Sequence, residues 1–343
     1  MKICLYLEFY NFLGGILFKD VGTGLLSSYR GQKEMLNHQN IAFVEEWNSS
    51  CDVLQINTPW LKSIYLMKKV RRQGKKVIVW SHVTAEDVVG VFRFSAPLAP
   101  IIKKYLIYAY GLADLIFCPT EYTKSLLVAY GLDPKKMVVL SNGVDLEKFY
   151  ADQGLRDLGR KKYLLDKVTI GTVGLVIPRK GTGTFISLAK EFSDYDFIWY
   201  GKIYGRLLAE TLPQDLPLNV NFTNFVKDED MLSAFNALDI FIFPSFEENE
   251  GMAILEAAAI GLPIIVRDIP VYEGWLKHEV NCLKAKNDED FSRCIKLLAE
   301  DHVLRRQICC NARELAFTRG KAALAKKYEE IYSQITKQEN AYR

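Results

Sequence analysis

The stretch DIFIFPSFEENEGMAILEAAAIGLPIIV, residues 239–266, contains a strand, an acidic loop, a helix and a second strand in succession. The apolar run before the loop and the run ending at Val266 are strand-like, and the Ala-rich run between them is helical and ends at Gly261. Strands that alternate with helices of this length predict a parallel sheet covered on both faces. Because ligands of such sheets bind at the carboxyl ends of the strands, the loop Glu247–Gly251 is the first candidate for a functional site.

The same alternation runs along the rest of the chain in two series. The first begins with ICLYLEF (residues 3–9) and ends with KMVVLSNG (136–143), and the second begins with KVTIGTVGLV (167–176). We therefore predict an α/β protein of two doubly wound, Rossmann-like domains that face one another across a cleft. The predicted domains are residues 1–148 and 149–318, and an amphipathic helix in residues 319–343 is expected to pack back on the first domain.

Composition places the chain among folded globular proteins with room for two domains. It has 343 residues, of which 49% are hydrophobic and 25% charged. The seven cysteines show no C-x-x-C spacing, so we interpret them as reduced thiols of a cytoplasmic protein. The first ten residues, interrupted by Glu8, predict a buried strand and not a signal peptide, and no apolar run approaches the roughly 20 residues that span a bilayer.

Charge is distributed unevenly between the two halves. Residues 1–150 hold 18 Lys and Arg against 13 Asp and Glu, a net charge of +5, and the remainder has a net charge of −2. The segment Lys68–Lys76 packs six cations into nine residues, and Val91–Gly111 is aromatic and apolar with three further cations. We predict peripheral contact with anionic lipid at the inner face of the membrane through this domain. The alternative is a buried helix beside a solvated basic helix end. Nucleic acid is excluded as a partner because the overall charge is balanced and no recognition module occurs.

Several short motifs, in this order and spacing, resemble the retaining glycosyltransferases of family 4, which have the GT-B fold. The motifs are WSH (residues 80–82), SNGVD (141–145), PRKG (178–181), the pair Glu248 and Glu256 with the lead-in Pro244–Ser245, and the GLPII strand after it. The resemblance implies that residues 1–148 form the acceptor-side domain and that residues 149–318 bind a nucleotide sugar. The segments LYLE, GTG, QINT, GKKVIVWSHVTAED and EENEGMAILEA are similar to bacterial enzymes that add a second hexose to glucosyl-diacylglycerol.

The acidic loop and the helix after it supply the predicted donor site. In the family the second glutamate of the pair holds the ribose, and Glu256 matches it, since a carboxylate can accept hydrogen bonds from two hydroxyls. Glu248 matches the first glutamate, which faces the donor hexose, although Glu247 or Glu250 could take this place. The amides of Gly251 and Met252 are expected to approach the sugar and phosphate at the helix N-terminus. The alternatives are a solvated helix carboxylate for Glu256 and a helix-capping acid for Glu248.

Arg179 and Lys180 lie in a turn after the first strand of the second domain. Two cations there suit a diphosphate, both when it binds and when it leaves. The chain departs from the family pattern, because Leu175 follows Gly174 where many members have an arginine, and Arg179 is expected to take over that role. The alternative is a solvated basic turn. Phe225 and Val226 complete the predicted donor-binding residues.

In the first domain, His82 ends a strand and matches a family histidine near the donor sugar. We expect it to hydrogen-bond a sugar hydroxyl and not to act as a general base; a structural histidine is the alternative. Gly22, Thr23 and Gly24 form a glycine turn before a helix, where the backbone can approach phosphate or acceptor. Asn57 and Thr58 are further acceptor-side candidates.

The resemblance implies an enzyme that transfers a hexose from UDP-glucose or UDP-galactose to a glycolipid, with retention of configuration. We expect neither a metal ion nor a bound cofactor, because the helix N-terminus, Arg179 and Lys180 would neutralise the departing diphosphate. A soluble or polysaccharide-precursor acceptor, a non-catalytic partner subunit and a pyridoxal-dependent phosphorylase are the alternatives. The sequence leaves the donor sugar, the linkage and the oligomeric state open.

Overall fold

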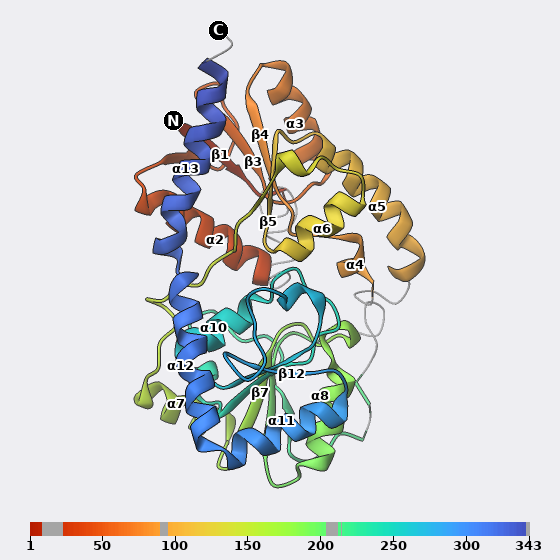
Figure 1. The fold of residues 1–343 in the computed structure, drawn as a ribbon, viewed down its shortest axis with the longest axis vertical. Coiled ribbons are helices and arrows are strands. Elements are labelled where there is room, and N and C mark those ends of the chain that lie inside the picture. The colour runs from red at the N-terminus through yellow and green to blue at the C-terminus, as the bar shows by residue number, and fades with distance from the viewer. Residues whose placement is uncertain (9–22, 90–94, 204–211, 214, 341–343) are drawn as a thin grey trace. The chain divides into compact units, whose positions relative to one another are not determined.

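The computed structural model describes residues 1–8, 23–89, 95–203, 212–213 and 215–340. The chain divides into two compact units. Unit 1 contains the N-terminal part of the chain up to Gly143 and the C-terminal segment from Gly320 onward, and unit 2 is formed mainly by Val144–Arg319. Each unit is built around one parallel sheet (Figure 1).

The sheet of unit 1 has six strands among the described residues, all parallel, in the order β2-β1-β3-β4-β5-β6. Its strands are β1 (Lys2–Tyr6), β2 (Ala42–Val44), β3 (Val53–Ile56), β4 (Lys76–Trp80), β5 (Leu115–Cys118) and β6 (Met137–Val139). The apolar runs are buried on both faces, as a parallel sheet requires. The three-residue strand β2 has no long apolar run, and our sequence analysis missed it.

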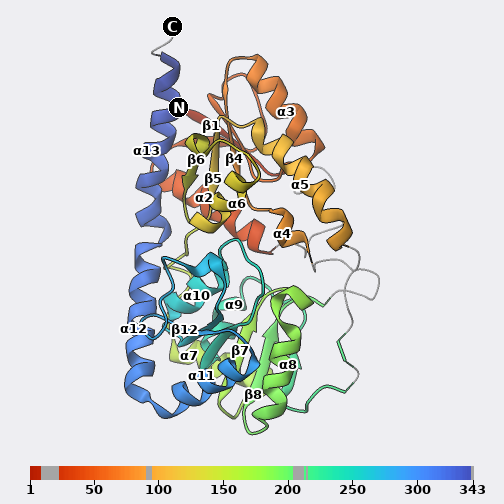
Figure 2. The same cartoon turned by 45° about the vertical axis from the view of Figure 1, so that its right-hand side comes forward.

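Helices cover both faces of this sheet. They are α2 (Thr23–His38), α3 (Leu61–Arg72), α4 (Ala85–Val88), α5 (Ser95–Gly111), α6 (Glu121–Ala129) and α13 (Lys321–Asn340). The blue helix α13 runs alongside the red helix α2 (Figures 1 and 2). Tyr328 and Tyr332 of α13 are buried in the same apolar cluster as Ile3 and Leu5 of β1. The last helix of the chain therefore completes the core of the first sheet.

The sheet of unit 2 also has six parallel strands within the described ranges, in the order β12-β11-β10-β7-β8-β9. They are β7 (Thr169–Val173), β8 (Asp196–Tyr200), β9 (Val220–Phe222), β10 (Ile240–Phe243), β11 (Ile264–Arg267) and β12 (Leu283–Ala285). The helices are α7 (Gln153–Tyr163), α8 (Thr182–Glu191), α9 (Met231–Asn236), α10 (Met252–Ile260), α11 (Asp288–Glu300) and α12 (His302–Thr318). Among the described residues there are also three single 3-10 turns, η2 (Pro134–Lys136), η3 (Pro178–Lys180) and η4 (Pro270–Tyr272).

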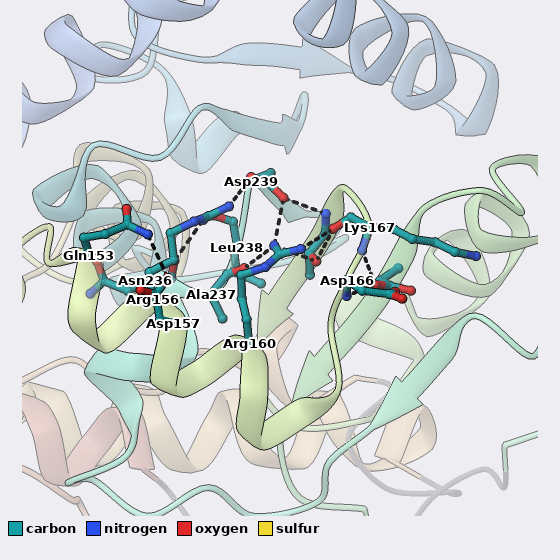
Figure 3. Close-up of polar contacts among 12 residues, drawn as sticks. Gln153, Arg156, Asp157, Arg160, Asp166, Lys167, Asn236, Ala237, Leu238 and Asp239 are labelled. Atoms are coloured by element: carbon teal, nitrogen blue, oxygen red, sulfur yellow. Dashed lines mark hydrogen bonds and ion pairs between the residues drawn. The ribbon is translucent and has the colours of Figure 1, made fainter.

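Asp239, at the start of β10, holds α7 against the amino-terminal edge of this sheet (Figure 3). Its carboxylate accepts hydrogen bonds from Arg156 at 2.6 Å, from Arg160 at 3.3 Å and from the amide of Thr169 at 2.8 Å. Arg156 also donates to the carbonyl oxygen of Leu238. This polar cluster lies at the edge opposite the carboxyl ends of the strands, so it anchors a helix and leaves the other edge for ligands.

The predicted fold class is confirmed: two doubly wound, Rossmann-like units follow one another along the chain. Further elements differ from the predicted pattern. The strand β12 was not predicted, because its three residues are too few to give a strand pattern. The strand expected over residues 219–226 has only three residues, because Asn224 has a φ of 64° and ends the extended run. The helix α7 was not predicted, because its sequence is mostly polar and packs through few apolar side chains.

Candidate active site

The acidic loop lies between β10 and α10, at the carboxyl end of a central strand of unit 2. The strand residues Ile240–Phe243 are all buried, and α10 is built of strong helix formers. Gly251 begins the helix with a φ of 84°, and Gly261 ends it with a φ of 86°. Because Gly251 has no side chain to cap the helix, the first amides of α10 have no N-cap side-chain acceptor.

The turn η3 contacts this loop through the backbone. The amide of Phe246 donates to the carbonyl oxygen of Arg179 at 2.8 Å, and the Arg179 guanidinium donates to the carbonyl oxygen of Glu247 at 2.5 Å. Gly181, with a φ of 84°, allows this approach: a Cβ atom there would lie 2.4 Å from the carbonyl oxygen of Pro244. The two loops on which the predicted donor-binding residues lie are therefore in direct contact.

Lys180 and Glu248 form a buried ion pair between the two loops. The Lys180 ammonium donates to Glu248 Oε1, and both side chains are mostly shielded from solvent. Burial opposes ionisation of the Glu248 carboxyl, but the charges of Lys180 and Arg179 outweigh it and hold its pKa below the ordinary value. Glu248 is therefore a carboxylate at neutral pH, within a cluster that holds two cations.

The other glutamates of the region are in different surroundings. Glu250 is 2% exposed and pairs with Arg319 at 3.2 Å, and this guanidinium lies 4.4 Å from the centre of the Trp275 ring. Glu256 is half-buried on α10. Each glutamate thus has its own environment, and Glu248 is the one paired with a predicted diphosphate-binding lysine.

Two residues beside the loop were missed by the sequence analysis. Arg267, the last residue of β11, is buried, donates to the carbonyl oxygen of Pro244 at 2.9 Å and stacks on the Phe246 ring at 3.9 Å. Tyr272 is fully buried, and both burial and the charge of Glu248 raise its pKa well above the ordinary value. A charged residue at the end of an apolar strand was the signal that could have identified Arg267; Tyr272 gave no such signal.

The remaining predicted donor-side residues lie at the carboxyl ends of β7 and β9. Gly174 follows β7, and its carbonyl oxygen accepts a hydrogen bond from the Trp199 indole at 2.8 Å. Phe225 and Val226 follow β9; Phe225 is 38% exposed and Val226 is half-buried. These positions lie on the same edge of the sheet as the acidic loop, because all strands of unit 2 are parallel.

His82 follows β4 in unit 1. Its Nε2 atom lies 3.2 Å from Asn57 Oδ1, and its ring stacks on Trp80 with a centroid distance of 5.5 Å. Burial lowers the pKa of His82 to about 3, so the imidazole is neutral at physiological pH. The second acceptor-side candidate, Thr58, accepts a hydrogen bond from the amide of Glu8 at 3.2 Å.

The predicted glycine turn is only partly visible. Gly22 lies outside the described residues, and Thr23 and Gly24 begin α2. A Cβ atom on Gly24 would meet no other atom within 4 Å. In the part of the chain that the structure describes, no cluster of three or more His, Cys, Asp or Glu side chains could hold a metal ion. Over the same residues, no helix is long and apolar enough to cross a membrane.

Two doubly wound units, one of which carries cations and an acidic loop at the carboxyl edge of its sheet, define the fold class of the protein as GT-B. Solved structures of this fold agree. Anabaena HepE, solved in complex with UDP-glucose, aligns with a TM-score of 0.75 and 16% sequence identity, covering 97% of this chain and 100% of that one.

Sequence comparison then identifies the family. Residues 30–148 match the family described as Glycosyltransferase Family 4, and residues 157–315 match Glycosyl transferases group 1. The processive diacylglycerol alpha-glucosyltransferase of Acholeplasma laidlawii is 34% identical over 308 residues, which cover 88% of this chain and 89% of the relative. The alpha-galactosylglucosyldiacylglycerol synthase of Streptococcus pneumoniae is 27% identical over 278 residues, covering 74% and 71%. The chain belongs to this family of glycosyltransferases and is a hexosyltransferase.

Proposed function

We propose that the enzyme transfers a hexose from UDP-glucose or UDP-galactose to a glycolipid such as glucosyl-diacylglycerol, with retention of configuration. The observation that supports this most strongly is the similarity, over 88% of the chain, to a relative named for glucosyl transfer to diacylglycerol. The names of both relatives specify alpha products. Because the hexose is alpha-linked in UDP-glucose and UDP-galactose, an alpha product means retention.

In this proposal, the positive charge that neutralises the diphosphate is supplied by the protein. Arg179 and Lys180 lie beside the acidic loop, and the first amides of α10 point out of the helix N-terminus. Together they would stabilise the charge that develops on the departing UDP, so we propose that transfer does not require a metal ion. Activity in the presence of EDTA should equal the activity without it; loss that magnesium or manganese restores would contradict this part.

The donor would be held by three groups of unit 2. Glu256 would accept hydrogen bonds from the ribose hydroxyls, and Glu248 would face the hexose at its reacting carbon. Phe225 with Val226 would contact the base, since an exposed aromatic ring at a strand end can stack on it. In unit 1, His82 would hydrogen-bond a sugar hydroxyl, and the turn Gly22–Gly24 would approach the acceptor.

Peripheral contact with a membrane is the second part of the proposal. Trp60, Leu61 and Tyr65 at the start of α3 and Leu98, Ile101 and Tyr108 of α5 are all at least 47% exposed. The two helices are neighbours there, because Tyr105 donates to the carbonyl oxygen of Pro59 and the Lys68 ammonium lies 5.2 Å from the Tyr108 ring. Apolar side chains and cations on one surface suit the interface of anionic lipid.

Vesicle sedimentation tests this surface. The double variant Leu61→Glu/Ile101→Glu should bind vesicles containing anionic lipid at least about tenfold more weakly, because each buried apolar side chain contributes about 1.5–3 kcal/mol. Leu158→Glu is the matched control, since Leu158 is 56% exposed on α7 of unit 2. Equal vesicle binding by Leu61→Glu/Ile101→Glu and by Leu158→Glu would contradict the proposal that this surface contacts the membrane. Absence of binding by the unmodified protein at low salt would contradict it as well.

The transfer reaction is tested by UDP release from a panel of UDP-sugars, with glucosyl-diacylglycerol in mixed anionic micelles as acceptor. Release that requires one donor and the glycolipid is the expected result. Glu256→Ala should lower kcat/KM at least about 100-fold, and Glu314→Ala, an exposed helical carboxylate on α12, should not. Release that the glycolipid does not stimulate would indicate a soluble or polysaccharide-precursor acceptor.

A further inference from the structure

A buried chain of polar side chains in unit 1 begins on α13. Tyr328 and Tyr332 are fully buried, one turn apart, and their hydroxyl groups lie 3.1 Å from each other. Both hydroxyls contact the side-chain amide of Gln55 on β3. The Tyr328 hydroxyl lies 2.9 Å from Gln55 Nε2 and 3.0 Å from Gln55 Oε1, and the Tyr332 hydroxyl donates to Gln55 Oε1. Gln55 has an exposed fraction of 0% in a strand whose other residues are apolar.

The chain continues from Gln55 to α2. Gln55 Nε2 donates to Gln32 Oε1 at 2.7 Å, and Gln32 Nε2 donates to Ser28 Oγ at 3.1 Å. Ser28 in turn donates to Asn142 Oδ1 at 2.6 Å. An unpaired amide in such a core is destabilising, whereas here both the amide nitrogen and the amide oxygen of Gln55 have hydrogen-bond partners.

His82 lies at the end of this chain. Gln32 Nε2 is 3.5 Å from His82 Nε2, which is also 3.2 Å from Asn57 Oδ1. Asn57 Nδ2 faces the carbonyl oxygen of Tyr6 at 3.5 Å, so Oδ1 is the atom turned toward the imidazole. Asn57 Oδ1 can only accept, so it favours a proton on His82 Nε2, whereas Gln32 Nε2 can only donate, so it favours the tautomer with the proton on Nδ1.

The ring plane of His82 is held separately. Its imidazole is parallel to the Trp80 indole, with an interplanar angle of 6°, and Trp80 contacts the Tyr328 ring at 6.1 Å. Stacking restrains the plane of the imidazole, and the polar contacts restrain rotation within that plane. The helix α13 thus reaches His82 through both the aromatic rings and the polar chain.

We propose that Gln32 and Gln55 are positioning residues for His82, held in place by the Tyr328 and Tyr332 hydroxyls of the C-terminal helix. This inference rests on the proposed contact of His82 with a sugar hydroxyl. A hydrogen bond to the reacting sugar depends on which ring nitrogen carries the proton and on where that nitrogen points. The residues that decide both are thus contributed by α2, β3 and α13.

The double variant Tyr328→Phe/Tyr332→Phe tests the inference, because it keeps both rings and removes only the hydroxyls. We expect kcat to fall about tenfold or more while the KM for the UDP-sugar changes less than about threefold. The ¹⁵N NMR shifts of the His82 ring should show a changed ratio of the Nε2–H and Nδ1–H tautomers. Tyr29→Phe is the matched control, since it removes a buried hydroxyl that donates to the carbonyl oxygen of Leu5 at 2.8 Å outside this chain.

A second variant, Gln32→Met, removes the amide donor beside His82 while keeping the volume of the side chain. The loss of kcat is expected again, and the tautomer ratio should move toward Nε2–H, because the donor that competes with this proton is gone. Tautomer and kcat that remain like the unmodified enzyme in both folded variants would overturn the inference. His82→Ala separates it from the proposed function. Full transferase activity in His82→Ala would contradict the sugar contact. The His82 NMR shifts of the tyrosine double variant and of Gln32→Met would still report whether the polar chain orients the ring.

Discussion

Gly181 is the residue on which the contact between the two donor-side loops depends. Its φ of 84° is unfavourable for other residues by about 1–2 kcal/mol, and a Cβ atom would lie 2.4 Å from a backbone oxygen that cannot move freely. Overpacking adds about 1–3 kcal/mol. We therefore expect Gly181→Ala to lower the free energy of unfolding by roughly 2–5 kcal/mol and to reduce transferase activity.

Thermal and denaturant unfolding measure this effect, with Gly183→Ala as the control. Gly183 lies in the first turns of α8, and a Cβ atom there would meet nothing within 4 Å. Alanine should therefore be neutral or stabilise by up to about 1 kcal/mol. Equal stability of the two variants would show that the Gly181 turn can relax without cost.

Glu248 allows a prediction about pH. Its pKa is lowered in the folded protein, so it contributes stability above its unfolded value of about 4.5, and this contribution is lost as the pH falls through the folded value. Glu248→Gln, which leaves Lys180 without its carboxylate, should be less stable than the unmodified protein at pH 7. The two stabilities should converge below about pH 4.5. Parallel curves of unfolding free energy from pH 7 to 3 would contradict the buried pair.

At the scale of elements, α3 is capped by a residue far from it in sequence. The Glu8 carboxylate accepts hydrogen bonds from the amides of Lys62 at 3.0 Å and Ser63 at 2.7 Å, in the first turn of the helix. Trp60 at the N-cap position makes no side-chain hydrogen bond to these amides. A carboxylate at a helix N-terminus also interacts favourably with the helix dipole.

Removal of this cap should destabilise the first turn of α3, which bears the exposed residues Leu61 and Tyr65. We expect Glu8→Ala to lower the free energy of unfolding by about 1–2 kcal/mol and Glu8→Gln, which keeps one acceptor, by less. Hydrogen exchange of the Lys62 and Ser63 amides should be faster in the alanine variant. Unchanged exchange at these two amides would contradict the capping role.

At the scale of the whole molecule, α13 belongs to the core of unit 1, although it follows unit 2 in the chain. Deletion of Lys321–Arg343 would expose the apolar cluster around β1. Each large buried side chain contributes about 1.5–3 kcal/mol, so the loss is comparable to the 5–15 kcal/mol by which a domain is stable. We expect hydrogen-exchange protection to be lost throughout unit 1.

Unit 2 is the internal control of this experiment. Its main apolar cluster consists of residues between Ile170 and Ile308 and includes none from α13. Its strands β7, β10 and β11 should keep their protection after the deletion. Retained protection in unit 1, or its simultaneous loss in both units, would contradict the separate cores seen in the structure.

The fold class could be predicted because its signal is local. Strands such as β4 and β10 are short apolar runs followed by helices, so each element is specified by its own residues and the alternation implies a parallel sheet. Among the elements that were missed, β2 and α7 have weak local patterns, and they are held by pairing with β1 and by the Asp239 cluster. Such contacts come from distant parts of the chain.

For the candidate site, the sequence likewise predicted which segments bear it but not which side chains pair within it. The acidic loop, the turn Pro178–Gly181 and His82 were singled out by residue type and position at strand ends, and their roles remain predictions. The sequence alone determined two doubly wound domains and the segments that bear the site, because both depend on short-range pattern. Only the tertiary structure decided that Lys180 pairs with Glu248, that Arg319 pairs with Glu250, and that α13 reaches Gln55 across 273 positions of sequence. The physical reason is that side-chain partners are set by packing, which brings together residues whose separation in sequence is not restricted.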